Sequence, residues 1–247
     1  MKEQVRRLAT RFLADDWPIL DCPVCRVGHL AAKPSDITCH NSAESVRYAD
    51  GDPTTIRGTM WGHLTCTNPS CGDAVAVGGD VSVDLTDETV YNYADLFQTF
   101  YQVRVLYPAI RVVDVPDGTP QSVDAALVDA AAVAWQNPSA AIGLLRTSVE
   151  RLMDAYAIPA QNQDGRYRSL HARLEDFKAK EPEAAKPLLA TKWVGNQGIH
   201  LPADMSIETF LDVAEFIELA LDLLYQHDTS AVRERIERIL ASKRLVD

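Results

Sequence analysis

Cys22-Pro23-Val24-Cys25 and Cys66-Thr67-Asn68-Pro69-Ser70-Cys71 are the two stretches that decide the fold predicted from this sequence. Each pair of cysteines can offer two thiolates from one tight turn, and four thiolates complete a tetrahedral zinc site. Cysteine pairs at the tips of β-hairpins are how zinc ribbons are built. We therefore predict a structural Zn²⁺ bound by Cys22, Cys25, Cys66 and Cys71.

A four-thiolate site is closed, with no open position for water, so we do not expect zinc catalysis. Zinc can supply about 10–16 kcal/mol of apparent binding free energy to the folding of a small domain. Cys39 or His40 could replace one ligand, and His63 is a further competitor. Because Cys39 lacks a partner at a comparable spacing, we expect it to be a partly buried free thiol. The alternative for all four cysteines is that they are ordinary reduced thiols.

The composition indicates a globular cytoplasmic protein. The chain has 247 residues, 47% of them apolar, and a net charge of −11. It contains no apolar run long enough to span a membrane and no apolar segment of a signal peptide at its start. Paired cysteines in a reducing compartment are expected to bind metal rather than to form disulfides. An acidic surface disfavours sequence-independent binding of nucleic acid, because it repels the phosphate backbone.

The first half of the chain carries mainly β patterns, which we assign to a domain over residues 1–115. Hydrophobic periodicity predicts a helix over residues 2–15, a long loop or irregular hairpin over 34–53, a strand over 59–65, a hairpin over 74–85 with a tight turn at Gly78-Gly79, a short helix over 88–100, and extended segments over 103–108 and 110–115. The turn signals from Val115 to Pro120 mark the predicted domain boundary.

The second half carries helical patterns. Apolar stripes and capping residues predict helices over residues 122–136, 139–156, 168–179, 183–194, 206–225 and 229–243. We therefore expect residues 121–247 to form an all-α bundle. The predicted fold class is α+β, with an N-terminal four-cysteine zinc-ribbon domain followed by this bundle.

One helical segment carries a candidate polar site. Lys192, Asn196 and His200 recur every four residues, so on a helix they share one face. Arg146 and Glu150 are also four residues apart, which predicts an ordinary ion pair on a helix surface. Three alternatives remain for Asn196 and His200. They form hydrogen bonds between helices, with Glu150 or Arg146 as partners; they belong to a catalytic or nucleotide-binding site; or they are ordinary polar residues of the surface.

These motifs resemble a known family. The helix from Ala140 to Leu152 is followed by Trp193-Val194-Gly195-Asn196 with His200 and then by Leu223-Leu224-Tyr225. Together with the cysteine motifs and Tyr107-Pro108, this order is similar to the bacterial family called domain of unknown function 4145. The resemblance covers roughly residues 20–226. It implies a HEPN-like helical bundle behind a zinc ribbon, commonly paired as a homodimer, in proteins often found with restriction or other antiviral defence systems.

HEPN ribonucleases carry an arginine a few residues before a catalytic histidine, and this sequence departs from that pattern. Trp193 to Gly195 occupy the window where the arginine is expected. The nearest base before His200 is Lys192, and Arg146 could substitute only from another helix.

Three functions follow as hypotheses. The first is a non-catalytic zinc-binding interaction module for a protein or nucleic acid in a bacterial defence or restriction-type system. The alternative is a HEPN-like, metal-independent endoribonuclease or toxin. In that enzyme His200 would act as acid and base, Lys192 or Arg146 would hold the scissile phosphate, and Asn196 would orient it. The third is a ribbon that binds DNA through Arg26, Lys33, Arg47 and Arg57.

Overall fold

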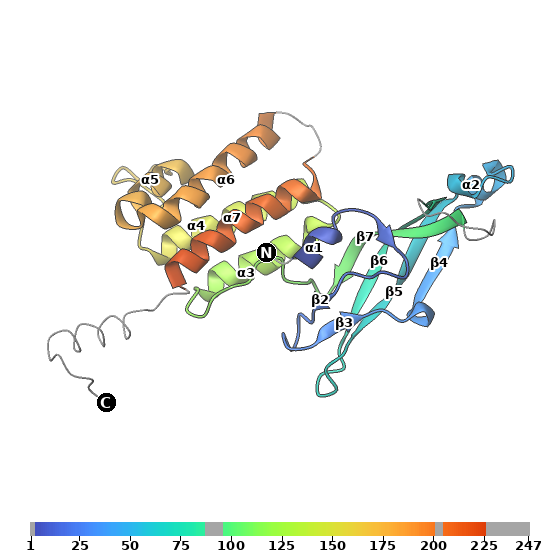
Figure 1. The fold of residues 1–247 in the computed structure, drawn as a ribbon. Helices are drawn as coiled ribbons and strands as arrows, with labels where there is room; N and C mark the ends of the chain where they lie inside the picture. Colours follow the sequence, from blue (N-terminus) through green and yellow to red (C-terminus); the bar gives the residue numbers. More distant parts are fainter. Residues whose placement is uncertain (1–2, 87–95, 201–204, 226–247) are drawn as a thin grey trace, which may run out of the picture.

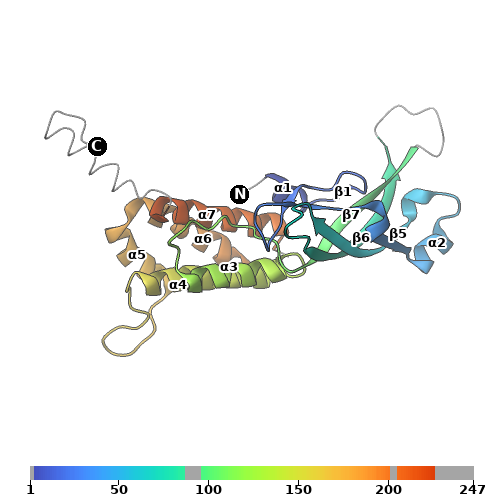
Figure 2. The ribbon, with the colours of Figure 1, turned by 90° about the horizontal axis from the view of Figure 1, so that it is seen from below.

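A computed structural model describes residues 3–86, 96–200 and 205–225; within it, the side chains of residues 192–200 are not described. The chain divides visibly into a β-sheet at one end and a group of helices at the other, with the N-terminal helix at their junction (Figures 1 and 2). The elements of the sheet half are α1 (Glu3–Arg7), β1 (Phe12–Leu13), β2 (Leu20–Asp21), β3 (His29–Ala31), η1 (Pro34–Asp36), β4 (Ile37–Asn41), α2 (Ala43–Tyr48), η2 (Pro53–Thr55), β5 (Arg57–Cys66), β6 (Ala74–Leu85) and β7 (Phe97–Tyr107).

Within the described residues, seven strands form one antiparallel sheet that curls into a half-barrel. The strand order is β1-β7-β6-β5-β3-β2, and β4 pairs with β5 beside β3. Alternate residues of β5 and β6, among them Met60, Leu64, Val75 and Val77, are buried. This period of two packs one face of the sheet and leaves the other face in solvent, which is the usual pattern for an antiparallel sheet.

The predicted hairpin over residues 74–85 is wrong, because β6 is one continuous strand. A register shift lies at Gly78 and Gly79: Gly78 pairs with Val105 and Gly79 with Val103, so that Arg104 is an extra residue on β7. A Cβ added to Gly79 would lie 2.1 Å from the carbonyl oxygen of Gln102. The two glycines therefore permit a close approach at a β-bulge, which bends and twists the strand pair, rather than a chain reversal.

Other local predictions also fail where strand pairing overrides a helical period. The helix predicted over residues 2–15 ends at Arg7, and Phe12 then pairs with Tyr101 of β7. Residues 97–100 belong to β7, whereas the rest of the short helix predicted over 88–100 falls largely outside the described residues. The segment 110–115 contains no strand. The long loop or irregular hairpin predicted over 34–53 instead holds β4 and α2, and β4 pairs with β5 in regular antiparallel register.

The helical half agrees well with the predicted periodicity. Its elements are α3 (Gln121–Ala134), α4 (Pro138–Ala155), α5 (Leu170–Lys180), α6 (Pro182–His200) and α7 (Ile207–Tyr225). The side chain of Asn137 caps α4 by accepting a hydrogen bond from Ala140 N at 3.0 Å, and Ser169 caps α5 in the same way. The helix predicted over 229–243 lies outside the described residues. Of the helices in the described part, none has both the length and the apolar character needed to span a bilayer.

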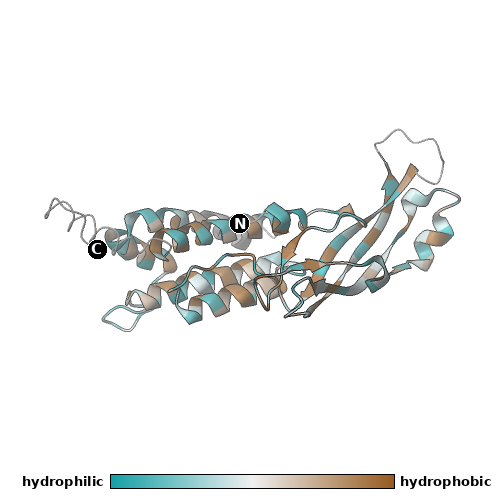
Figure 3. Cartoon of the chain, turned by 60° about the horizontal axis from the view of Figure 1, so that its bottom comes forward, coloured by the Kyte–Doolittle hydropathy of each residue, from teal (hydrophilic) through white to brown (hydrophobic). Residues whose placement is uncertain are grey.

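The sheet and the helices share a continuous set of buried residues that runs from Val5 to Leu221. Figure 3 shows hydrophobic and hydrophilic residues alternating along strands and helices in both halves. At the junction, Arg6 of α1 forms ion pairs with Asp212 and Glu215 of α7, and the buried carboxylate of Glu218 accepts a hydrogen bond from Asp114 N at 2.9 Å. The α1 segment and the linker before α3 therefore hold the two halves together.

The predicted fold class, a zinc ribbon followed by a HEPN-like bundle, is wrong. The β half is a seven-stranded curled sheet with long strands and its own packed face, and a helical region follows it. A zinc ribbon is a small unit that depends on its metal for a core. Here the cysteine turns lie at one end of β5 and β6, strands of 10 and 12 residues whose buried side chains form a hydrophobic layer beyond the turns.

Candidate metal centre

The four cysteines come from two turns of the sheet. Cys22 and Cys25 lie between β2 and β3, whereas Cys66 is the last residue of β5 and Cys71 lies in the turn before β6. Leu30 of β3 pairs directly with Cys66. Because β3 and β5 are adjacent strands, their pairing places the two turns side by side, although more than forty residues separate them in sequence.

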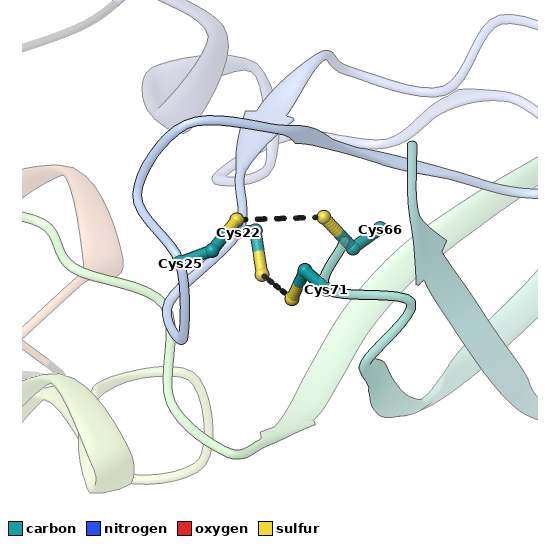
Figure 4. Close-up of side chains that lie close together, drawn as sticks. All are labelled: Cys22, Cys25, Cys66 and Cys71. Carbon is teal, nitrogen blue, oxygen red and sulfur yellow. Dashed lines mark hydrogen bonds between the residues drawn. The ribbon is translucent and has the colours of Figure 1, made fainter. Parts of the chain in front are cut away.

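The four sulfur atoms form one compact group, in which all lie within 4.8 Å of one another. The Sγ atoms of Cys22 and Cys71 are 3.9 Å apart, and those of Cys25 and Cys66 are 3.6 Å apart (Figure 4). Four sulfurs placed about 2.3 Å from a central zinc ion at the corners of a tetrahedron lie about 3.8 Å from one another. The donor set therefore fits a tetrahedral four-thiolate zinc site.

The first turn depends on Gly28. Its backbone N–H donates to the Sγ of Cys25 at 3.4 Å, and its carbonyl accepts from Cys22 N at 2.9 Å. A Cβ at this position would lie 2.6 Å from the Sγ of Cys66. Arg26, directly after Cys25, adopts a positive φ of 56°. Glycine is thus required at position 28 by the close approach of the second turn, not by its own φ angle.

The second turn depends on Asn68. The N–H of Asn68 donates to the Sγ of Cys66 at 3.4 Å, and its side-chain amide lies 3.7 Å from the Sγ of Cys25 in the other turn. Its carbonyl accepts hydrogen bonds from the N–H groups of Cys71 and Gly72, at 2.9 and 3.0 Å. Donors directed at sulfur stabilise the thiolate form, which is the form that binds metal.

The surroundings of the sulfurs differ. Hydrogen bonds from the backbone N–H groups of Gly28 and Val27 lower the pKa of Cys25 to about 6. Burial raises the pKa of Cys66. The backbone hydrogen bond of Asp73 lowers the pKa of Cys71, but burial and the neighbouring sulfurs outweigh it and raise the value to about 12. One thiolate thus disfavours the ionisation of its neighbours, and a divalent cation is the charge that offsets this repulsion.

The competing ligands take other places. Cys39, exposed on β4, has its Sγ 3.3 Å from the hydroxyl of Tyr101. Cys39 is therefore a free thiol outside the four-cysteine group, and more exposed than we predicted. The Nε2 of His63 lies 3.7 Å from a carboxylate oxygen of Asp36. Neither histidine, His40 or His63, is among the residues that the described structure groups with the four sulfurs.

Of the four candidate catalytic residues in the helical half, only Arg146 has a described side chain. Its Nε donates to Glu150 at 3.1 Å, and both side chains are half exposed, as predicted for a surface pair on one helix. Lys192, Asn196 and His200 all lie on α6, but their side chains fall outside what the structure describes. Two of the candidate DNA contacts form local bonds: Arg47 and Arg57 donate to backbone carbonyls within their own segments.

Sequence reasoning identified the four cysteines and missed Asn68. A residue between two ligands carries no sequence signal for a contact that crosses to the other turn. The tight Asn-Pro-Ser segment before Cys71 was the available hint, because Asn side chains often bond to backbone groups two residues further on, as Asn68 does with Ser70 N at 3.0 Å.

Two family models match the chain, one on each side of the linker between the sheet and the helices. Residues 128–241 match the family model described as "Domain of unknown function (DUF4145)", which supports the resemblance for the helical half. The cysteine motifs and Tyr107-Pro108, which the resemblance over residues 20–226 included, lie outside this match. Residues 10–108 match a second model, "Domain of unknown function (DUF8608)". No curated protein and no solved structure matches the chain. The sheet half thus lies within the match to the second model, and most of the helical half lies within the match to the first.

Proposed function

We propose that this chain is a non-catalytic interaction module whose β half is stabilised by one structural zinc ion. The observation that supports this is the four-sulfur group, in which every pair of Sγ atoms is closer than 4.8 Å. Four thiolates fill the tetrahedral coordination of zinc, so no position remains at which the ion could activate water or polarise a carbonyl. The ion would link two turns and fix the end of the sheet.

The turn that carries Cys25 is also a candidate contact surface. Val24 and Val27, on either side of Cys25, are 54% and 76% exposed, and Ile19 nearby in sequence is 60% exposed. Apolar side chains held on a metal-ordered turn lose little conformational entropy on binding, which favours recognition of a protein partner. The net charge of −11 also favours a protein over a nucleic acid. The association with a bacterial defence or restriction-type system rests on the family resemblance.

The proposal is tested by affinity purification of the tagged full chain from its host. Val24→Ser with Val27→Ser should lose a partner that wild type retains, while zinc content stays at one ion per chain. Tyr167→Ser, which changes an 83% exposed side chain in the helical half, is the matched control and should retain the partner. Retention of every partner by the Val24/Val27 variant would reject this surface, and a catalytic activity dependent on the ion would reject the structural role.

A second candidate is a metal-independent ribonuclease centred on His200. Its support is that α6 runs unbroken to His200, so Lys192 and Asn196 precede it on one helix at intervals of four residues. The test is cleavage of RNA by the purified chain and by His200→Ala, with His171→Ala as a control on the exposed surface of α5. Cleavage that is lost only in His200→Ala would favour the enzyme; equal cleavage in all three proteins, or none in any, would remove it.

A further inference from the structure

The outer edge of β4 has no strand beside it in the described part of the chain. Residues 37–41 pair with 58–62 of β5 on one side, and among the strands that the structure describes β4 pairs with β5 alone. Figure 1 shows β4 at the border of the sheet, on the side away from the helices. The strand contains no charged residue and no proline, and its positions 38–41 are exposed. It therefore lacks the charges, prolines and bulges by which edge strands avoid pairing with other chains.

The register shows which groups of β4 face outward. Ser42 N donates to Arg57 O at 2.7 Å, directly after the pair Asn41–Gly58. Hydrogen-bonded and non-hydrogen-bonded pairs alternate in an antiparallel ladder, so His40 and Thr38 also bond to β5. Ile37, Cys39 and Asn41 then direct their N–H and C=O groups away from β5. In agreement, a Cβ added to Gly58 would lie 2.3 Å from the carbonyl oxygen of His40, which therefore points toward β5.

The outward groups are spaced symmetrically about Cys39, two residues before it and two after it. We propose that a second copy of this chain pairs with this edge, β4 against β4, antiparallel about a two-fold axis at Cys39. Cys39 would face Cys39 of the partner subunit, and Ile37 would face Asn41 of the partner subunit. Each pair would exchange two N–H···O bonds, which is the arrangement that a hydrogen-bonded antiparallel pair requires.

A second copy fits this edge better than a foreign strand, for reasons of symmetry and charge. A two-fold axis brings residues near it opposite their own copies, so a charge there would repel itself. The axis passes through an uncharged strand, although the whole chain carries −11. Three exposed apolar side chains flank the edge: Val46 (50%) and Tyr48 (75%) on α2, and Trp61 (49%), which pairs with Thr38. They extend a short strand pairing toward the area that a specific interface needs.

This inference does not rest on the zinc site. It places self-association on the sheet, whereas the family resemblance implies a homodimer of HEPN-like bundles. The decisive pair of variants is Cys39→Ser and Cys39→Pro in the full chain. Proline removes the outward N–H of residue 39 but no bond to β5, since that N–H faces solvent. Serine preserves the N–H and removes only the thiol.

Sedimentation velocity across a wide concentration range should show wild type and Cys39→Ser dimerising alike, and Cys39→Pro with a dissociation constant raised at least about tenfold, equivalent to about 1.4 kcal/mol. Zinc content and circular dichroism check that each variant is folded. Independently of the proline variant, a short bifunctional maleimide should join wild-type chains by a link between their Cys39 residues, identified by peptide mass mapping, and Cys39→Ser should lack this link. A wild type that stays monomeric to its solubility limit, a dimer unaffected by Cys39→Pro, or a dimer not linked through Cys39 would overturn the proposal.

Discussion

Serine substitutions of Cys25 and Cys39 test the metal site at the level of single residues. Cys25 belongs to the four-sulfur group, whereas Cys39 lies outside it. Cys25→Ser removes the thiolate whose Sγ lies 3.6 Å from that of Cys66. A hydroxyl binds zinc far more weakly than a thiolate, so the variant should retain well under half an ion per chain after dialysis, and its thermal midpoint should fall. Cys39→Ser should keep both values. Elemental analysis and calorimetry decide; equal zinc in the two variants would contradict the assignment.

Gly28 contributes to the same site without ligating the metal. Gly28→Ala places a methyl group 2.6 Å from the Sγ of Cys66 and 2.8 Å from the backbone nitrogen of Asn68. The turns must separate to accept it, so we expect zinc affinity to fall by at least about tenfold, or about 1.4 kcal/mol. Competition with a chromophoric chelator measures the change. Gly143→Ala is the control, because an added Cβ there meets nothing within 4 Å; a loss of affinity no larger than the control's would show that the turns can relax.

At the residue scale, the four candidate ligands could be named from the sequence, and the residues that support them could not. Thiolate pairs at short spacing have few roles other than metal binding in a reducing compartment, so four positions could be named from type and spacing alone. The contacts of Gly28 with Cys66 and of Asn68 with Cys25 cross between turns. They depend on how β3 and β5 are aligned, which local sequence does not encode.

At the scale of elements, the β-bulge between β6 and β7 at Gly78 and Gly79 is the feature most sensitive to a single methyl group. Gly79→Ala would bring a Cβ to 2.1 Å from the backbone oxygen of Gln102, which cannot move without disturbing β7. We expect a loss of about 1–3 kcal/mol in the free energy of unfolding, as for other overpacked sites. Gly143→Ala in α4 should instead gain about 0.5–1 kcal/mol, since alanine favours a helix interior. Urea unfolding of both variants measures the difference, and an unchanged midpoint for Gly79→Ala would argue against the bulge.

The ion pair between Arg111 of the linker and Asp124 of α3 predicts that the stability of the fold depends on pH. The hydrogen bond from Arg111 lowers the pKa of Asp124 below its usual value of 3.8. A carboxyl with a lowered pKa in the folded state adds stability above its unfolded pKa and loses it as pH falls through the folded value. Asp124→Asn should therefore be less stable than wild type near neutral pH, and the difference should shrink progressively in acid below about pH 4. Urea unfolding from neutral to acidic pH tests this; a constant difference would exclude the linkage.

The elements also show where periodicity succeeds. The stripe of α7, with Phe210, Leu211, Ala214, Ile217 and Leu221, is buried as its spacing predicts. Helices encode their buried face within a few turns, so the bounds of α3, α4, α5 and α7 followed from the sequence to within two residues. The end of α6 did not, because α6 continues to His200, six residues beyond the predicted end at residue 194. The bounds of the strands did not follow from the local sequence. Phe12 and residues 97–100 become strands only because they pair with residues far along the chain. A glycine pair inside an alternating run is likewise ambiguous between a turn and a bulge.

For the whole molecule, the sequence did not reveal that the sheet and the helices share one hydrophobic core. Separate halves were expected on either side of residues 116–120, yet buried residues from the sheet, the linker and the helices make one cluster, and Glu218 of α7 bonds to Asp114 of the linker. The four-cysteine group was enough to predict a metal site. The β domain predicted from it was too small, because the same two turns can lie at the end of a zinc ribbon or of a long curled sheet. The domain boundary itself stays a prediction.

The central claim is that four cysteine thiolates hold one structural zinc ion, and X-ray absorption at the zinc edge of freshly purified, reduced protein tests it most directly. The sulfur geometry predicts one zinc per chain with a shell of four sulfur ligands at about 2.3 Å and no nitrogen or oxygen ligand. The spectrum should be unchanged in Cys39→Ser. A protein purified without zinc, or a shell that includes oxygen or imidazole nitrogen, would contradict the claim.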